Sequence, residues 1–254
     1  MSLDPIDRVL AALVRREPVD QPVAVVVAHP DDETIGAGPL LPLFRRLLLV
    51  HVTEGAPRDL RDAQAYGFDS ATAYAAAREA ELQAALGAGG IVATRRTLAI
   101  PDQQASVNLS ELAATLRDLI SNETIVLTHA YEGGHPDHDA VAFAAQASGR
   151  KRIEMALYHA GADGGIATGG FLPGPPATAV HLAAAEQAMR ETMLDCFTTQ
   201  QGTLRPFRGA TALHFRPAPT YDFTHPPASR VYYDGFDWVM TSTRWCELAA
   251  AVTL

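Results

Sequence analysis

The sequence contains little cysteine. Only Cys196 and Cys246 occur in 254 residues. Two thiols are too few for a disulfide framework or for a metal site built from thiolates. Hydrophobic residues make up 48% of the chain, which is enough for a sizeable apolar core.

Long apolar runs and positive charge are also scarce. Every apolar run falls short of the ~20 residues that span a bilayer, so we expect no membrane span. The first residues lack a basic region followed by an apolar one, so we expect no signal peptide and a cytoplasmic location. Lys and Arg number 20 against 29 Asp and Glu. This acidic balance argues against non-specific binding to nucleic acid or to anionic membranes.

Apolar runs and turn residues alternate along the chain. They predict strands over residues 23–28, 47–53, 98–100, 124–130 and 153–159. They predict helices over 3–16, 34–46 (interrupted by Pro39 and Pro42), 70–86 (capped by Asp69 or Ser70), 109–120 (capped by Asn108), 137–148 and 183–197. The order predicts an α/β fold, a Rossmann-like, doubly wound, mostly parallel sheet with helices on both faces.

The length allows one large α/β domain or two small ones. We interpret residues 1–254 as a single domain. Residues 56–67 and 161–179 are rich in Gly and Pro or in mixed charge, which predicts loops. Residues 204–254 alternate Pro-rich turns with short apolar pieces, and they form a poorly predicted C-terminal extension.

One stretch, VAVVVAHPDDETIGAG at 23–38, joins a continuous apolar run to a polar cluster. The run is typical of a strand buried on both faces of a parallel sheet. His29, Asp31, Asp32 and Glu33 follow where that strand ends, which is where open α/β sheets bind ligands. Burying several carboxylates beside a histidine is costly unless a cation is present, so the stretch indicates a divalent metal.

A second cluster repeats this arrangement. His135-Pro136-Asp137-His138 follows the strand predicted at 124–130, and Pro136 suits the first turn of a helix. Right-handed crossovers bring the ends of parallel strands to the same edge of the sheet. The two clusters are therefore expected to share one metal ion.

Histidine nitrogens with a carboxylate oxygen suit catalytic zinc, which takes three protein ligands and keeps one open position. Fe²⁺ or Mn²⁺ also fits such a site. Of the neighbours Asp31 and Asp32, one can bind the metal while the other stays free as a base. The structural alternative is that the histidines cap helices and that both acids lie at a solvated helix N-terminus.

AHPDDE at 28–33 together with HPDH at 135–138 resembles the LmbE/PIG-L family of zinc-dependent N-deacetylases, and the similarity extends from about Val23 to His159. That family includes sugar de-N-acetylases that act on N-acetylglucosaminyl-inositol and related glycosides. The resemblance implies a hydrolase that uses zinc-activated water to remove an N-acetyl group from an N-acetylated sugar or glycoconjugate.

Residue by residue, the resemblance implies metal ligands at His29, Asp32 and His138, with Asp31 as the general base. It implies that His135, in its cationic form, stabilises the oxyanion and protonates the leaving amine.

The resemblance further implies that Asp137 orients an imidazole and that Arg78 and Glu81, in an Arg-x-x-Glu pattern, contact the sugar. Some family members have a tyrosine two residues before the first histidine of the second motif. That position is Gly133 here, and the role of the nearest tyrosine, Tyr131, stays open.

Several of these residues also have a purely structural interpretation. Asp137 is equally suited to cap the helix that follows it, and Arg78 with Glu81 to form a surface ion pair. The remaining candidates are interpreted structurally: Glu33 as an acid of a helix N-terminus, His51, His129 and His159 as core histidines, and Trp238 and Trp245 as core rather than as a sugar platform.

Two other functions remain open from the sequence. One is a zinc hydrolase of another N-acyl amide, and the other is a catalytically inactive sugar-binding protein. The expected partner is a small N-acetylated glycoside or amide, and a homo-oligomer is compatible with the sequence.

Overall fold

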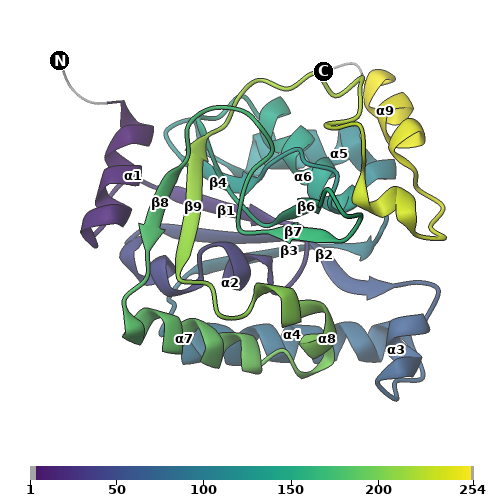
Figure 1. Cartoon of the computed structure of the whole chain (residues 1–254), viewed down its shortest axis with the longest axis horizontal. Coiled ribbons are helices and arrows are strands. Elements are labelled where there is room, and N and C mark those ends of the chain that lie inside the picture. Colours follow the sequence, from purple (N-terminus) through teal and green to yellow (C-terminus); the bar gives the residue numbers. More distant parts are fainter. Residues whose placement is uncertain (1–3, 253–254) are drawn as a thin grey trace.

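A computed structural model describes residues 4–252, and within them the core is a seven-stranded sheet. Its order is β3-β2-β1-β4-β5-β9-β8 (Figure 1). The first five strands in this order are parallel to one another. Strand β9 pairs antiparallel with β5, and β8 pairs antiparallel with β9. The strands are β1 (Val23–Val27), β2 (Leu47–Pro57), β3 (Thr94–Asp102), β4 (Ile125–His129), β5 (Arg152–Met155), β8 (Thr178–His181) and β9 (Ala212–Pro217). A separate two-stranded sheet pairs β6 (Tyr158–Ala160) with β7 (Ile166–Thr168).

Apart from the helix predicted at 34–46, the predicted helices are present with small shifts in their bounds. The α-helices are α1 (Pro5–Arg15), α2 (Asp32–Gly36), α3 (Arg61–Ala65), α4 (Ala71–Ala88), α5 (Leu109–Leu119), α6 (Pro136–Ala147), α7 (Ala184–Asp195), α8 (Gln201–Leu204) and α9 (Ser242–Ala250). Short 3₁₀ turns cover Gly38–Leu43, Ala105–Asn108, Thr198–Gln200, Arg205–Phe207 and Tyr232–Gly235. The first helix was predicted from residue 3, which lies outside the described residues.

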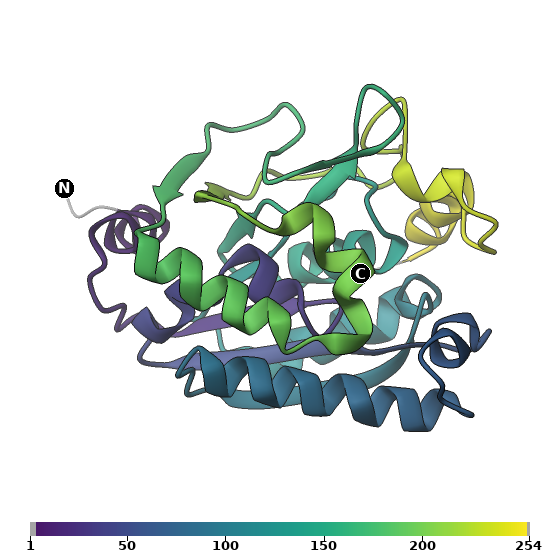
Figure 2. The same ribbon diagram turned by 60° about the horizontal axis from the view of Figure 1, so that its bottom comes forward.

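Helices cover both faces of the sheet because β1 is apolar on both sides. Val23, Val25 and Val27 pack into a core shared with α1, α4 and α7, whereas Ala24 and Val26 pack against α5, α6 and α9. Figure 2 shows α4 and α7 running alongside each other on the first face. The mostly parallel, doubly wound architecture predicted from the sequence is therefore confirmed.

The strand order places the two polar clusters together. The chain passes from β1 outwards to β2 and β3, then returns to β4 on the other side of β1. Ligands bind in the crevice at such a switch point, beyond the carboxyl ends of the strands. His29 lies just after β1, and His135 lies in the turn between β4 and α6.

Two predicted strands differ from the observed ones. The strand predicted at 98–100 is longer, because β3 lies at the edge of the sheet and tolerates the half-buried Arg95 and the exposed Arg96, which hide its pattern. The strand predicted at 153–159 divides into β5 and β6, which belong to different sheets.

Prolines and capping groups account for further differences. The helix predicted at 34–46 is α2 followed by a 3₁₀ turn that contains Pro39 and Pro42. Ser70 caps α4 by accepting a hydrogen bond from the backbone N–H of Ala73, as one of the two predicted caps. Asn108 occupies the predicted N-cap position of α5, but its side chain makes no capping hydrogen bond, and its amide donates to the carbonyl of Gln104 instead.

Regions expected to be loops carry regular structure. Residues 56–67 include the end of β2 and all of α3, and residues 161–179 include β7 and the start of β8. The poorly predicted residues 204–254 supply β9, which joins the central sheet, and α9, which packs on α6.

Phe215→Ala tests whether the C-terminal extension is part of the folded core. Phe215 is 0% exposed in β9 and opposes Met155 of β5 and Thr178 of β8. Loss of a buried phenyl ring is expected to lower the free energy of unfolding by about 3–5 kcal/mol, measured by denaturant titration. The control Val92→Ala, at a side chain that is 88% exposed, should change it by less than about 0.5 kcal/mol. A loss below about 1 kcal/mol for Phe215→Ala would place β9 outside the cooperative core.

Candidate metal centre

The turn after β1 holds Asp31 in a strained conformation. Asp31 has φ +146°, which a residue with a side chain rarely adopts. Its N–H donates to Glu33 Oε2 at 3.1 Å, and its carbonyl accepts from the N–H of Thr34 at 2.9 Å. Asp32 Oδ2 accepts the N–H of His29 at 2.7 Å. These bonds direct the side chains of Asp31 and Asp32 to different places, although the residues are adjacent.

The turn after β4 is fixed by a histidine cap and a glycine. His135 caps α6, because its Nδ1 accepts the N–H of Asp137 at 3.1 Å, and Pro136 begins the helix as predicted. A Cβ on Gly134 would lie 2.5 Å from the carbonyl oxygen of Tyr158. Only glycine therefore allows β6 to pass so close to this turn.

Donor atoms of three side chains from the two turns converge. His29 Nδ1 lies 3.2 Å from His138 Nε2 and 3.4 Å from Asp32 Oδ2, and His138 Nε2 lies 3.3 Å from Asp32 Oδ1. Zinc holds its nitrogen and oxygen ligands at ~2.0–2.1 Å in a tetrahedron, which puts the donors ~3.3–3.4 Å apart. The three side chains are buried and form a group with the dimensions of a metal site.

Burial and neighbouring groups together set the charges of His138 and Asp32. Burial lowers the pKa of the His138 imidazole to about 4, so this ring is neutral at pH 7. Burial works against the charged form of Asp32 as well, yet the imidazoles of His138 and His129 hold its pKa well below the usual range. A neutral imidazole and an ionised carboxylate are the forms that bind metal.

The Asp31 carboxylate stands beside this group and is paired with a cation. Its Oδ2 accepts from Arg78 Nη2 at 2.9 Å, and the same nitrogen donates to the carbonyl of Pro30 at 2.6 Å. Burial raises the pKa of Asp31 to about 7, although Arg78 opposes the shift. A carboxyl group with this pKa can take up and return a proton near neutrality.

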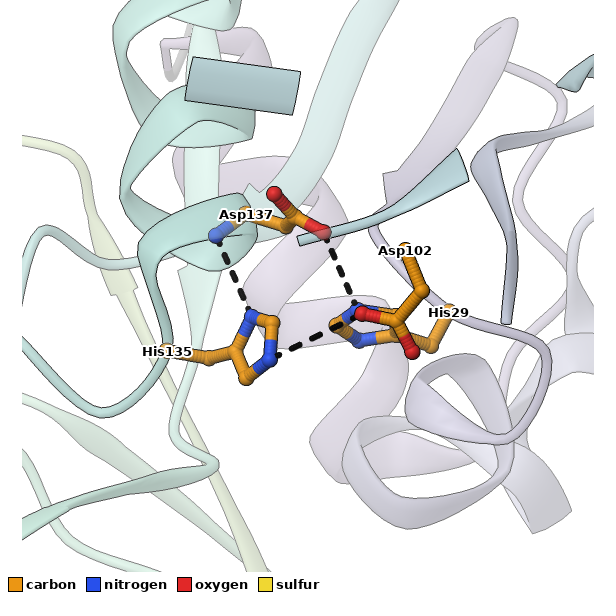
Figure 3. Close-up of side chains that lie close together, drawn as sticks. All are labelled: His29, Asp102, His135 and Asp137. Atoms are coloured by element: carbon orange, nitrogen blue, oxygen red, sulfur yellow. Dashed lines mark hydrogen bonds and ion pairs between the residues drawn. The ribbon is translucent and has the colours of Figure 1, made fainter. Parts of the chain in front are cut away.

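A second cluster surrounds the other nitrogen of His29 (Figure 3). His29 Nε2 lies 3.2 Å from Asp102 Oδ1 and 3.5 Å from Asp137 Oδ2, and His135 Nε2 lies 3.8 Å from Asp102 Oδ1. Burial disfavours the charged form of His29, but Asp102 raises its pKa well above the ordinary value. The carboxylate of Asp102 thus holds the ring with Nδ1 turned towards Asp32 and His138.

Asp102 was missed by the sequence analysis. It is the last residue of β3 and follows Pro101, in the edge strand whose length was underestimated. The sequence feature that could have identified Asp102 is an acidic residue at the carboxyl end of the strand that pairs with β2.

Asp137 is not the helix cap, because His135 occupies that position. Its Oδ2 accepts the N–H of Gln103 at 2.6 Å and its Oδ1 accepts the N–H of Ala105 at 2.9 Å. Asp137 therefore anchors the loop after β3 that presents Asp102, and the imidazole nearest its carboxylate is that of His29.

The cationic His135 expected from the sequence does not match this environment. Burial, with His29 nearby, lowers the pKa of the His135 imidazole to about 3. Because Nδ1 accepts a hydrogen bond from Asp137, the neutral ring carries its proton on Nε2.

Arg78 and Glu81 form the predicted ion pair, with Arg78 Nη1 3.4 Å from Glu81 Oε2, but both residues are buried, so its expected surface location is wrong. Arg78 lines the cavity beside the two turns. Glu81 accepts hydrogen bonds from the hydroxyl groups of Thr198 and Thr199 and from the N–H of Thr199, at 2.7–2.8 Å. Its carboxylate is thus occupied in holding that 3₁₀ turn to α4.

Two buried histidines, His129 and His51, contact residues of the site. His129 Nε2 accepts the N–H of Ala28 at 2.9 Å, and its ring stacks on His138 with centroids 4.0 Å apart. His51 Nε2 lies 3.1 Å from Glu33 Oε2, the oxygen that also accepts the N–H of Asp31. Glu33 is accordingly a buried partner in the first turn of α2 rather than a solvated acid.

These groups open into a cavity of about 380 Å³, a volume suited to a small ligand. The predicted site residues that line it are His29, Asp31, Asp32, Arg78, His135 and His138. Trp245 is buried in the core as predicted, but Trp238 is half-buried and lines the cavity. Tyr131 does not line it, because its hydroxyl group donates to the carbonyl of His225 within an aromatic cluster.

The comparisons agree with this geometry. The family model "PIG-L: GlcNAc-PI de-N-acetylase" matches residues 24–148, which contain both clusters. Residues 24–148 of the chain belong to the PIG-L family. A comparison with curated protein sequences finds no match.

Solved structures share the PIG-L fold with this chain. The zinc-inhibited form of teicoplanin deacetylase Orf2 superposes with a TM-score of 0.58 at 16% identity, over 79% of this chain and 100% of that one. The A40926 pseudoaglycone deacetylase Dbv21 gives 0.56 at 18%, over 80% and 100%. A conserved protein from Thermus thermophilus, TT1542, gives 0.54 at 19%, over 83% and 99%. At these identities the likeness establishes the fold alone.

Within residues 4–252, no helix has both the length and the apolar character needed to cross a bilayer.

His29→Ala and His138→Ala are each expected to reduce bound zinc from about one ion per chain to a small fraction of that, because each removes one of three converging donors. Elemental analysis after dialysis against buffered zinc measures this. The matched control is His159→Ala, since His159 Nδ1 bonds the carbonyl of Ala160 away from the cluster. Full zinc occupancy in both variants would exclude these histidines as ligands.

Proposed function

We propose that this protein is a metal-dependent hydrolase that removes the N-acetyl group from an N-acetylated sugar or glycoconjugate. The observation that carries the proposal is the convergence of His29 Nδ1, Asp32 and His138 Nε2 at 3.2–3.4 Å, with the carboxyl group of Asp31, held by Arg78, beside them. Membership of the PIG-L family and deacetylases among the solved structures of the same fold support the substrate class.

His29, Asp32 and His138 would hold the metal. Zinc fits their donor set best, and Fe²⁺ or Mn²⁺ is compatible with it. When bound, a zinc ion lowers the pKa of water from 15.7 to about 7 and polarises a carbonyl oxygen.

Asp31 acts as the general base and then as the acid. It takes a proton from the attacking water and returns it to the departing nitrogen, which leaves as the free amine. Its pKa of about 7, set by burial against Arg78, suits both steps. Arg78 holds the carboxylate in place through its 2.9 Å contact.

His135 stabilises the charge that develops on the amide oxygen. Its Nδ1 accepts from the N–H of Asp137, so Nε2–H is the donor available to an oxyanion in the cavity. A neutral imidazole is a poor proton source, and for this reason we assign protonation of the amine to Asp31 rather than to His135. Asp102 and Asp137 keep the rings and the β3 loop in position.

The proposed reaction is tested by incubating the zinc-loaded protein with methyl and aryl glycosides of N-acetylglucosamine and detecting the free amine. Release of amine and acetate in equal amounts is expected. Turnover only on non-sugar N-acyl amides would point to the other hydrolase class. Absence of turnover on every acylated amine, with zinc bound, would contradict an enzymatic function.

Asp31→Asn is expected to retain zinc and to lower kcat by about 10²–10⁴-fold, because the amide cannot accept a proton. Steady-state kinetics and elemental analysis on the same sample provide the measurement. Asp20→Asn, at an exposed carboxylate paired with Arg45, is the control and should change neither quantity. Parallel loss of zinc and activity in Asp31→Asn would make Asp31 a ligand instead of a base.

His135→Ala is expected to retain zinc and to lower kcat by about 10²–10³-fold, the usual effect of removing one oxyanion donor. His225→Ala, at an exposed histidine, is the matched control and should keep full activity. An unchanged kcat in His135→Ala would remove it from the chemical step.

A further inference from the structure

The cavity has an aromatic side that the function proposed above does not use. Tyr158, Tyr232, Phe236 and Trp238 line it, and we call these four residues the aromatic wall. The Phe236 and Trp238 rings stack with centroids 4.8 Å apart, and Phe236 meets Tyr232 at 5.1 Å. Phe236 is 43% exposed, a large fraction for a phenyl ring. All four residues lie beyond residues 24–148, the part of the chain that matches the family model.

The aromatic wall is anchored to the catalytic turn. The N–H of Tyr232 donates to the carbonyl of Gly133 at 2.8 Å, and the Tyr233 hydroxyl group donates to Asp139 Oδ2 at 3.2 Å. Ser242 ties together the two ends of residues 234–242, because its N–H and hydroxyl group donate to Asp234 at 2.7 and 2.6 Å. The rings are therefore held in a fixed relation to His135.

Arg78 and Trp238 lie next to different turns of the metal centre. Arg78 contacts Asp31 in the turn after β1, whereas Trp238 lies 5.0 Å from the His135 ring in the turn after β4. A second cavity, of about 360 Å³, shares Trp238, Asp102 and Gln103 with the first. Trp238 thus lines both the catalytic cavity and the second cavity.

The stereochemistry of a 2-acetamido sugar fits this asymmetry. Its amide is attached to C2, and C2 is flanked by C3, which bears a hydroxyl group, and by C1, which bears the aglycone. With the amide at the metal centre, C3 and C1 point to opposite sides. The hydroxyl groups need polar partners such as Arg78, which leaves C1 directed towards His135 and Trp238.

We propose that the aromatic wall is an aglycone subsite, which binds the apolar face of a ring attached to C1, either a second sugar or an aromatic group. This inference rests on the function proposed above, since it assumes that the acetamido group lies at the metal centre. Trp238 contributes through stacking and apolar contact, and it selects substrates without taking part in the chemistry.

Binding of product-like glycosides tests the subsite without turnover. The probes are the methyl, p-nitrophenyl and β-linked disaccharide glycosides of glucosamine, titrated into zinc-loaded protein by calorimetry. The wild type is expected to bind the two ring-bearing probes about three- to tenfold more tightly than the methyl glycoside. Trp238→Ala should reduce this ratio to about one, and Trp238→Phe should give an intermediate value. Val92→Ala, far from the cavity, is the control and should keep the wild-type ratio.

Intrinsic fluorescence adds a direct readout. Trp238 and Trp245 are the only tryptophans in the chain, and Trp245 is fully buried. The nitrophenyl probe should quench the wild-type emission, and Trp238→Phe, which keeps an aromatic ring, should abolish the quenching.

If Trp238→Ala loses the preference for the disaccharide or for the p-nitrophenyl glycoside over the methyl glycoside, the subsite is supported. The probe that is affected then shows whether the subsite binds a second sugar or an aromatic group. An unchanged preference with both rings overturns it, even if the protein deacetylates sugars. If no acetylated sugar is turned over but the preference still depends on Trp238, the proposed reaction fails while the ring subsite stands.

Discussion

The structure depends on the approach of three buried polar side chains whose donor atoms are placed to share one cation. His29 Nδ1, Asp32 and His138 Nε2 come from turns about a hundred residues apart, yet they lie 3.2–3.4 Å from each other. Burying these polar side chains together is costly unless they are paired with one another or with a cation. Their spacing fits the coordination of a zinc ion, and such a site explains the strained backbone of Asp31 beside them.

The rest of the fold holds these atoms in place. The parallel strands β1 and β4 bring both turns to the switch point of the sheet. Asp102, at the end of the edge strand β3, faces the second nitrogen of His29, and Asp137 anchors the loop that follows Asp102. The C-terminal segment then closes the cavity on the side of His135 with Trp238. Elements from distant parts of the sequence therefore contribute to one small volume.

The sequence predicted those parts of the fold and the site that depend on local pattern. Continuous apolar runs identified β1 and β4, and the polar residues after them include every converging donor. Asp102 was missed because an edge strand lacks a continuous apolar run. Trp238 was taken for core because its position depends on distant contacts, such as that between Tyr233 and Asp139, which no local pattern encodes. The charge of His135 depends on burial among neighbours, and the sequence does not show that burial.

The central claim is tested most directly by a crystal structure of the zinc-loaded protein with anomalous scattering recorded at the zinc edge. We expect one strong anomalous peak about 2.0–2.2 Å from His29 Nδ1, an Asp32 oxygen and His138 Nε2, with Asp31 outside bonding distance. A peak on the opposite side of the ring, bound by His29 Nε2 and Asp102, or no peak between the two turns, would contradict the account.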